Sequence, residues 1–160
     1  MEFSKLSNPR QAALITCRDD SETPEKDNIM TVAWHSPVSS DPPMYAISIQ
    51  KDGFSKDIIQ KTRCFSVNFM SERFEKDVLF CGRVSGMHTD KFQECSFTKE
   101  DSNTIDCPRI KEASSFYECE IINEVETGDH IIFIGKVTHH EQKENTDRIF
   151  HLGGDVFKTI

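Results

Sequence analysis

The chain has 160 residues and a mass of 18.4 kDa, which suits one domain that buries roughly 70% of its unfolded surface in a single core. Its 19 Lys and Arg against 27 Asp and Glu give a formal net charge of −8, which argues against nucleic acid or an anionic membrane as the main partner. Any anion that the chain binds must therefore be held by a local cluster of donors.

The six cysteines are scattered and form no C-x-x-C pair, so they give no zinc-ribbon or thioredoxin signal. Several lie in apolar runs, where free cysteine behaves as a small buried hydrophobe, and we expect reduced thiols. No metal site is expected, since the doublet His139-His140 points to opposite faces of its strand. The first eleven residues lack the apolar core of a signal peptide, and no apolar run approaches the ~20 residues that span a bilayer. These features predict a soluble, cytoplasmic protein.

Residues 12–17 form a short apolar run that predicts a first strand, and the polar residues 18–27 predict an exposed turn. A second strand is predicted over 29–34. A hydroxyl-rich loop with Ser36, Ser39 and Ser40 should follow it, ending at Pro42-Pro43. Such a loop is either a plain surface connection or a way to aim backbone donors and hydroxyls at a ligand.

The next predicted elements are a strand over 44–49 and, after Gly53, a helix over 54–62 with Ile58 and Ile59 on its apolar face. Ser55 then lies near the start of this helix. A hydroxyl at that place suits a phosphate group and equally suits plain capping of the helix. Both interpretations remain open at this point.

Residues 64–70, CFSVNFM, predict a fourth strand in which Asn68 is the polar member and faces solvent by default. A helix is predicted over 72–80. The following stretch, CGRVSGMHTDKF, places Ser85 between two glycines and adds Lys91 just before an aromatic residue. It is either a loop whose backbone approaches a ligand closely or a connection with a solvated lysine.

Residues 93–114 predict only a polar connection with one short strand at 109–111. From 117 to 126, apolar residues alternate with Glu118, Glu120 and further polar residues, which predicts a strand with its acidic side chains facing outward. A turn at 127–129 and a return strand over 130–142 complete a hairpin. His130 opens the return strand, where a lone histidine is usually solvated.

Taken in order, these stretches resemble the flavin reductase-like, FMN-binding split-barrel family, in its flavoredoxin and ferric reductase-like branch. The likeness extends from Pro9 to Phe157, although this chain lacks the glycine that the family usually carries before the N-I-M-T run. It rests on the F-x-V-N run that ends at Asn68, the S-G-x-x-x-D-K-F run over 85–92, G-D-H at 128–130 and the terminal L-G-G. In the first motif stretch it is carried by Asn28, Met30, Thr31, Trp34, Ser36, Pro37, Pro42 and Pro43.

The resemblance implies a mainly β fold over residues 1–160 as one domain. It is a Greek-key-like, antiparallel split β-barrel of six or seven strands with a few short helices. Such a small barrel supplies a flavin groove but covers it poorly, and in the family a homodimer interface completes the groove. The expected cofactor is tightly bound FMN, with NAD(P)H as a transient reductant.

The resemblance also implies roles for single residues. His130 and Lys91 are the catalytic candidates, with the imidazole beside the flavin edge. Trp34 and Phe157 offer aromatic walls, and Ser55 suits the phosphate together with Ser85. The full set of cofactor-binding candidates is Asn28, Met30, Thr31, Val32, Ala33, Trp34, Ser48, Ile49, Gln50, Ser55, Asn68, Ser85, Gly86, Asp90, Lys91, His130 and Phe157.

The sequence contains no G-x-G-x-x-G, P-loop or G-x-S-x-G motif, so nothing in it supports a Rossmann unit or a hydrolase elbow. A nicotinamide nucleotide would therefore dock transiently on the flavin. Three functions remain open: an NAD(P)H-dependent flavin or flavin-linked reductase, an FMN electron carrier reduced by a protein partner, and an acidic barrel that binds no flavin.

Overall fold

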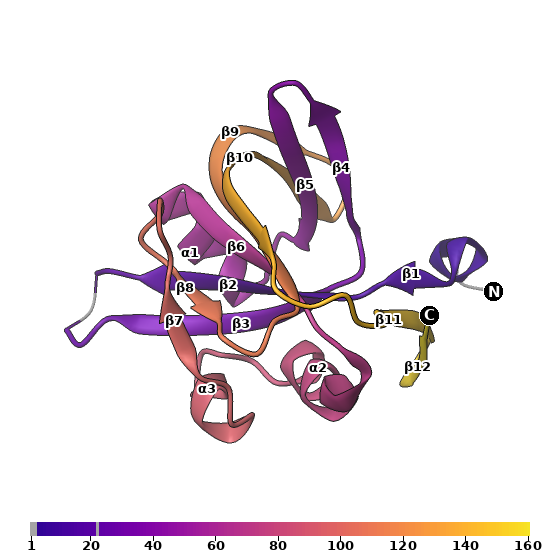
Figure 1. Cartoon of the computed structure of the whole chain (residues 1–160). Helices are drawn as coiled ribbons and strands as arrows, with labels where there is room; N and C mark the ends of the chain where they lie inside the picture. Colours follow the sequence, from indigo (N-terminus) through magenta and orange to yellow (C-terminus); the bar gives the residue numbers. More distant parts are fainter. Residues whose placement is uncertain (1–2, 22) are drawn as a thin grey trace.

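The computed structural model describes residues 3–21 and 23–160, and its main feature is a strongly curved, seven-stranded antiparallel sheet (Figure 1). The strand order is β3-β2-β6-β9-β10-β5-β4. Among the described residues no ladder joins the outer strands β3 and β4, so the split barrel stays open. The strands are β2 (Ala13–Asp19), β3 (Lys26–Val32), β4 (His35–Ser40), β5 (Pro43–Gln50), β6 (Cys64–Phe69), β9 (Ser115–Glu126) and β10 (His130–Gln142). The predicted fold class is confirmed.

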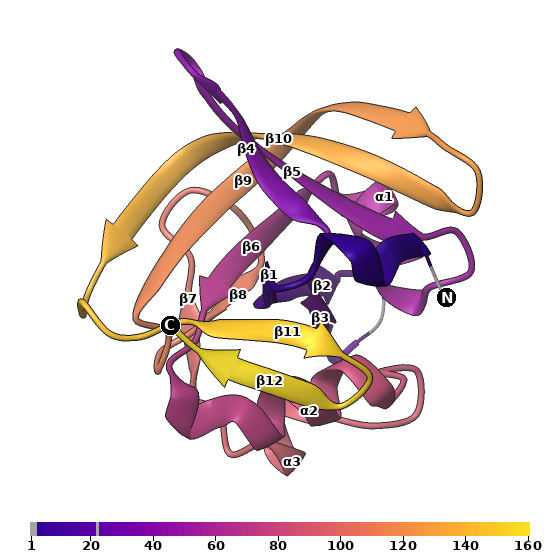
Figure 2. The ribbon, with the colours of Figure 1, turned by 90° about the vertical axis from the view of Figure 1, so that its right-hand side faces the viewer.

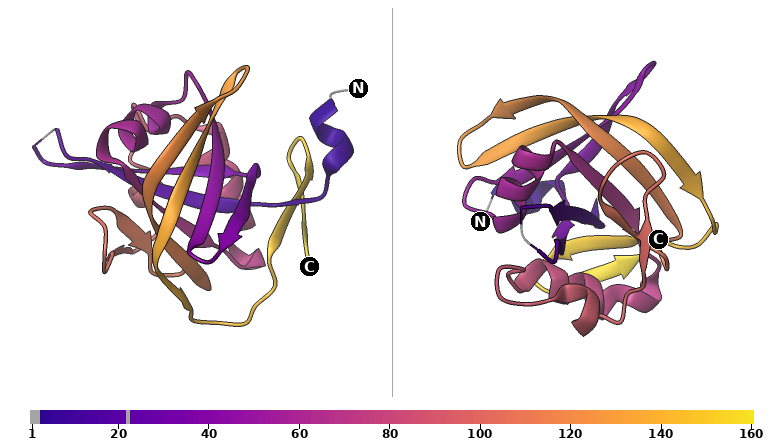
Figure 3. Two further views of the ribbon diagram at one scale, coloured as in Figure 1. Left: turned by 90° about the horizontal axis from the view of Figure 1, so that it is seen from above. Right: turned by 90° about the vertical axis from the view of Figure 1, so that its left-hand side faces the viewer.

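A second sheet of three strands, in the order β1-β11-β12, joins the two ends of the chain. Figure 2 shows the β11–β12 hairpin running alongside α2, and Figure 3 shows the same hairpin on one side of the molecule together with the N-terminal 3-10 helix. The remaining elements are η1 (Phe3–Ser7), β1 (Arg10–Gln11), α1 (Phe54–Thr62), η2 (Glu72–Phe74), α2 (Glu75–Arg83), α3 (Lys91–Glu94), β7 (Lys99–Asp101), β8 (Pro108–Ile110), β11 (Ile149–Gly153) and β12 (Val156–Thr159).

Two apolar cores lie on opposite faces of β2, the strand next to the edge strand β3. Ile15 packs inside the curved sheet with Ile59 of α1, whereas Leu14 packs with Ile29 and with Val78 of α2 on the other face. All five side chains are fully or almost fully buried. β2 is therefore covered on both sides, which explains its near-continuous apolar sequence. The two cores fix α1 and α2 against the sheet.

The predicted loop over 36–40 is wrong, because these residues form the edge strand β4. It pairs antiparallel with β5, with a register shift between Pro37 and Ser39. Prolines lack the N–H that a central strand needs, but an edge strand has one side that needs no ladder. The serines therefore belong to a hairpin arm and not to a loop that surrounds a ligand.

The prediction that the acidic side chains of β9 face outward is wrong at Glu118, whose side chain is fully buried. Its carboxylate accepts hydrogen bonds from the backbone N–H groups of Asn103 (2.9 Å) and Thr104 (2.8 Å). It also lies 3.2 Å from the Arg109 guanidinium. The connection between β7 and β8 thus folds over β9 and uses Glu118 as its anchor. Residues 93–114 contain two short strands, where one was predicted.

The other predicted elements occur near their expected bounds, including α1 over Phe54–Thr62 and β10 over His130–Gln142. All six cysteines are buried free thiols. The predicted turn over 18–27 is shorter than expected, since β2 ends at Asp19 and β3 begins at Lys26. The predictions for the first eleven residues and for this turn include residues 1, 2 and 22. These three residues lie outside the described part of the chain. Within the described part, none of the helices has the length and apolar character needed to cross a membrane.

Candidate functional site

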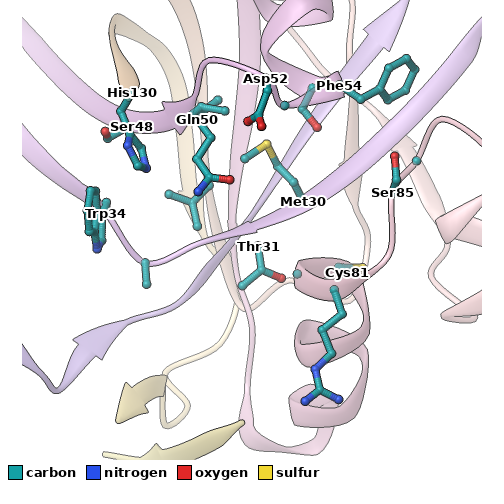
Figure 4. Close-up of a pocket in the computed structure, with 18 of the residues that line it drawn as sticks. Met30, Thr31, Trp34, Ser48, Gln50, Asp52, Phe54, Cys81, Ser85 and His130 are labelled. Carbon is teal, nitrogen blue, oxygen red and sulfur yellow. The ribbon is translucent and has the colours of Figure 1, made fainter. Parts of the chain in front are cut away.

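A cleft of about 690 Å³ lies where the ends of β3, β5 and β10 meet the first turn of α1 and the last turn of α2. Its volume falls in the range of roughly 300–1,000 Å³ that is usual for small-molecule sites. Figure 4 shows Trp34 and His130 at one end of the cleft and Phe54 and Ser85 at the other. The cleft is therefore long enough to bring an aromatic end and a hydroxyl-bearing end together in one site.

Fourteen of the seventeen candidates from the sequence line this cleft, although they come from five separate stretches of the chain. The structure thus brings most of them together, which sequence spacing alone could not establish. The lining candidates are Asn28, Met30, Thr31, Val32, Ala33, Trp34, Ser48, Ile49, Gln50, Ser55, Ser85, Gly86, Lys91 and His130. The three that do not line the cleft are Asn68, Asp90 and Phe157.

Asn68 has a structural role. Its side chain is fully buried, donates to the Leu14 carbonyl (3.1 Å) and accepts from the Ile110 N–H (2.9 Å). The amide therefore connects β6 to β2 and β8, and it faces neither solvent nor the cleft. A β-strand pattern shows that a residue is polar, but it does not show which neighbouring strand the residue bonds.

Asp90 and Phe157 lie behind the residues that line the cleft. Asp90 caps α3, because its Oδ1 accepts from the backbone N–H groups of Phe92 (3.0 Å) and Gln93 (3.2 Å). Phe157 packs against the second core and lies 5.3 Å from the ring centroid of His151, which does line the cleft. The expected aromatic wall at Phe157 is thus replaced by His151 in front of it.

Lys91 is almost completely buried at the cleft wall. Its Nζ donates to the carbonyls of Ile29 (2.7 Å) and Cys81 (2.9 Å), which ties α2 and β3 together. Burial lowers the pKa of this ammonium below its ordinary value of 10.5. An ammonium has three N–H donors, so one remains for a ligand in the cleft after these two bonds. Lys91 is therefore both a structural tie and a source of positive charge in the wall.

Asn28 and Ser55 form a buried polar pair in the cleft. Asn28 Nδ2 donates to Ser55 Oγ at 2.7 Å, and neither residue is more than 5% exposed. Asn28 Oδ1 is buried without a hydrogen-bond partner among the described residues. A Cβ at Gly86 would lie 1.9 Å from this oxygen, so only glycine fits beside it. A buried acceptor without a partner costs about 1–3 kcal/mol, which a ligand donor could offset.

The first turn of α1 also faces the cleft, through Gly53, Phe54 and Ser55. Its N-cap residue Gly53 has no side chain to bond the free N–H groups of the turn. Those N–H groups and the positive end of the helix dipole make this helix start suitable for a phosphate group. Across the cleft, Ser85 adds a second hydroxyl, which accepts a hydrogen bond from the Met87 N–H at 3.2 Å.

The aromatic end is formed by Trp34 and His130, whose rings stack with centroids 4.6 Å apart and planes 26° apart. His130 Nδ1 lies 2.7 Å from Asp129 Oδ1, and this hydrogen bond lowers the pKa of the Asp129 carboxyl. The guanidinium of Arg10 lies 5.8 Å from the Trp34 ring. His130 is thus oriented on both sides, by a carboxylate and by an aromatic face.

Three basic residues that the sequence reasoning missed also line the cleft: Arg10, Arg83 and His151. Arg83 is two residues from the S-G motif and could have been noticed there. Arg10 and His151 meet because β1 pairs with β11, a contact between the two ends of the chain that no local pattern reveals. With Lys91 they make the cleft basic within an acidic chain, since its only acidic lining residues among those described are Asp52 and Asp129.

Comparison with known proteins shows what this chain is similar to. Residues 6–158 match the family model described as "Flavin reductase like domain". An uncharacterized protein of Archaeoglobus fulgidus is 34% identical over 115 residues, which cover 72% of this chain and 65% of that protein. A flavin reductase of Pseudomonas putida is 27% identical over 126 residues, covering 78% of this chain and 71% of that enzyme.

Solved structures show the same fold. An FMN-binding protein from Thermus thermophilus superposes with a TM-score of 0.86 at 23% identity, covering 96% of this chain and 87% of that one. A flavoredoxin of Desulfovibrio vulgaris (Miyazaki F) gives 0.87 at 22% identity, with 96% and 88% covered. The fold and the cleft define the class, a split-barrel protein with a small-molecule-sized cleft among its described residues. The family match then makes the assignment specific: the chain belongs to the flavin reductase-like family.

Proposed function

We propose that this chain is an FMN-binding oxidoreductase whose bound flavin takes hydride from NADH or NADPH. The observation that supports the proposal most strongly is that one cleft has a phosphate-suited end, at Ser55 and the start of α1, and an aromatic end, at Trp34 and His130. The residues present also fit the cofactor chemically, because the unpartnered Asn28 oxygen and the space beside Gly86 leave room for a polar ligand. The flavin reductase of Pseudomonas putida among its relatives supports the same activity.

The roles of the residues follow from what a flavin needs. When bound, FMN supplies a ring that accepts hydride and gains negative charge. Ser55, Ser85 and the free N–H groups of α1 would hold its phosphate. Lys91 and the backbone of residues 31–33 would supply positive partial charge along the ring. Trp34 and His130 would leave a flat aromatic face at which nicotinamide can stack, with Asp129 orienting the imidazole.

The same fold supports a second candidate, an FMN electron carrier that a protein partner reduces. The likeness to a flavoredoxin at a TM-score of 0.87 favours this alternative. The two functions differ only in the source of electrons, so both require the FMN site. Direct reduction by a nicotinamide nucleotide separates them.

The test is a spectrum of the purified protein with FMN, taken without oxygen before and after addition of NADH and then NADPH. We expect the flavin absorbance to bleach with one or both nucleotides within minutes. A protein that binds FMN but stays oxidised with both would support the electron carrier. A protein that binds no FMN at all would contradict both candidates.

A further inference from the structure

Three basic side chains gather at the mouth of the cleft, and we call Arg10, Arg83 and His151 the mouth cluster. They come from β1, the C-terminal end of α2 and β11, and all three line the cleft. In a chain with a net charge of −8, this gathering is the opposite of what the composition predicts. Positive charge concentrated in a cleft attracts and orients anionic ligands.

The backbone holds the cluster in place. Arg10 and His151 are direct cross-strand partners in the β1–β11 ladder, so their side chains lie side by side. One guanidinium nitrogen of Arg10 donates to the Ser7 hydroxyl (2.5 Å) and to the Ser4 carbonyl, whereas its Nε is buried without a partner among the described residues. Two of the three side chains are thus fixed by pairing between the ends of the chain.

Arg83 is held differently, because it forms an ion pair with Asp155 in the turn between β11 and β12. Both side chains are more than half exposed, at 55% and 58%. An exposed ion pair is weak, so a more highly charged anion can replace Asp155 as the partner of Arg83. The pair also joins the β11–β12 hairpin to α2, and these elements lie side by side in Figure 2.

FMN has one phosphate group, and the cleft already offers a place for it at the start of α1, with Ser55 and Ser85. The mouth cluster is therefore a second set of anion donors that FMN does not require. The ligand that brings further phosphates into this cleft, under the proposed function, is the nucleotide that reduces the flavin. Arginine suits phosphate oxygens well, because its planar fork can donate two hydrogen bonds at once.

We propose that the mouth cluster binds phosphate groups of the nicotinamide dinucleotide, and that Asp155 competes with them for Arg83. This inference rests on the proposed function. The phosphates are either the pyrophosphate, which NADH and NADPH share, or the 2′-phosphate, which only NADPH has. Substitutions on the two sides of the Arg83–Asp155 pair should then act in opposite directions.

The first experiment measures kcat and KM of the FMN-loaded protein for NADH and NADPH at low ionic strength. Arg83→Gln should raise KM about tenfold with little change in kcat, as expected for one lost charged hydrogen bond. Asp155→Asn should lower KM by a few fold, because it frees Arg83. Arg73→Gln and Asp147→Asn are the controls, since both residues are exposed, lie outside the cleft and change the net charge equally.

The second experiment measures binding of ADP and of adenosine 2′,5′-bisphosphate to the FMN-loaded protein by calorimetry. Weaker binding of ADP by Arg83→Gln assigns the cluster to the pyrophosphate, which the bisphosphate lacks. Weaker binding of the bisphosphate alone assigns it to the 2′-phosphate. If Arg83→Gln instead weakens FMN binding and leaves both nucleotides unaffected, the cluster serves the flavin phosphate and the inference is wrong.

The two proposals can fail separately. If neither dinucleotide reduces the flavin of the parent protein, the proposed function is wrong, and the calorimetry still decides whether the mouth cluster binds nucleotide phosphates. If the flavin is reduced but Arg83→Gln behaves like Arg73→Gln in both experiments, the function stands and the mouth cluster has no part in it.

Discussion

Among the glycines described in the cleft, Gly86 leaves the least room for a side chain. A methyl group there would meet the Asn28 side chain at 1.9 Å, so Gly86→Ala must displace Asn28 and disturb its bond to Ser55. We expect FMN affinity to fall at least tenfold and the free energy of unfolding to fall by about 1–3 kcal/mol. FMN titration and urea unfolding measure the two effects.

Gly128→Ala is the matched control for this change. Gly128 has no atom within 4 Å of its potential Cβ, so the same added methyl group should change stability by no more than about 0.5 kcal/mol. Equal effects of the two substitutions would show that Asn28 and Gly86 do not form a defined ligand site.

Lys91 has a structural role and, under the proposed function, also binds the flavin. Lys91→Met keeps the apolar stem but leaves the Ile29 and Cys81 carbonyls without their donor, which should cost about 1.5–3 kcal/mol of stability. FMN affinity should also fall by roughly 10- to 100-fold if the third N–H binds the flavin. Lys76→Met, on the exposed face of α2, should change neither quantity. Lower stability with unchanged FMN affinity would limit Lys91 to its structural role.

At the scale of elements, His35 joins three strands. Its Nε2 lies 2.9 Å from the Gln11 carbonyl of β1, which can only accept, and its Nδ1 lies 2.7 Å from the Tyr45 hydroxyl of β5. Both bonds are satisfied by the neutral ring with its proton on Nε2. Burial lowers the pKa of this histidine below its ordinary value of 6.5.

The sign of the pH effect follows from this lowered pKa. Below pH 6.5 the unfolded chain takes up a proton at His35 that the folded protein does not, so stability is lost as the pH falls. We expect the free energy of unfolding, measured by urea titration, to fall between pH 7.5 and pH 5.5 by at most about 1.4 kcal/mol per pH unit. His35→Gln should flatten this dependence. An equally steep loss in the variant would show that other groups cause it.

Elements with regular periodicity could be predicted from the sequence, and irregular contacts could not. The alternation of β9 and β10 and the helical spacing of Ile58 and Ile59 depend only on local patterns. β4 was missed because prolines and serines resemble a loop unless one knows that the strand lies at a sheet edge. Glu118 was misplaced because its partners come from a connection that has no pattern of its own.

For the site, too, local motifs could be predicted and contacts between distant segments could not. The motif order indicated most of the residues that line the cleft, since each motif lies at the end of a predictable element. Arg10 and His151 were missed because their contact joins the two ends of the chain, and Phe157 was misplaced because His151 stands in front of it.

At the scale of the whole molecule, the open sheet and the exposed apolar residues near the cleft support a homodimer. Phe3 lines the mouth of the cleft and is 78% exposed, and the neighbouring Leu6 is 73% exposed. We propose that a second copy covers them, with an interface of roughly 2,000 Å² or more in total. Light scattering of the FMN-loaded protein should give twice the 18.4 kDa chain mass. A monomer at micromolar concentration would contradict this assembly.

The measurement that tests the central claim most directly is an FMN titration of the purified protein, followed in the same cuvette by anaerobic addition of NADH and NADPH. We predict binding of about one FMN per chain. Excess FMN at 100 times its dissociation constant should then stabilise the fold by about 2.7 kcal/mol. One of the nucleotides should bleach the bound flavin. A colourless protein whose stability is unchanged by excess FMN would show that the chain has no FMN site.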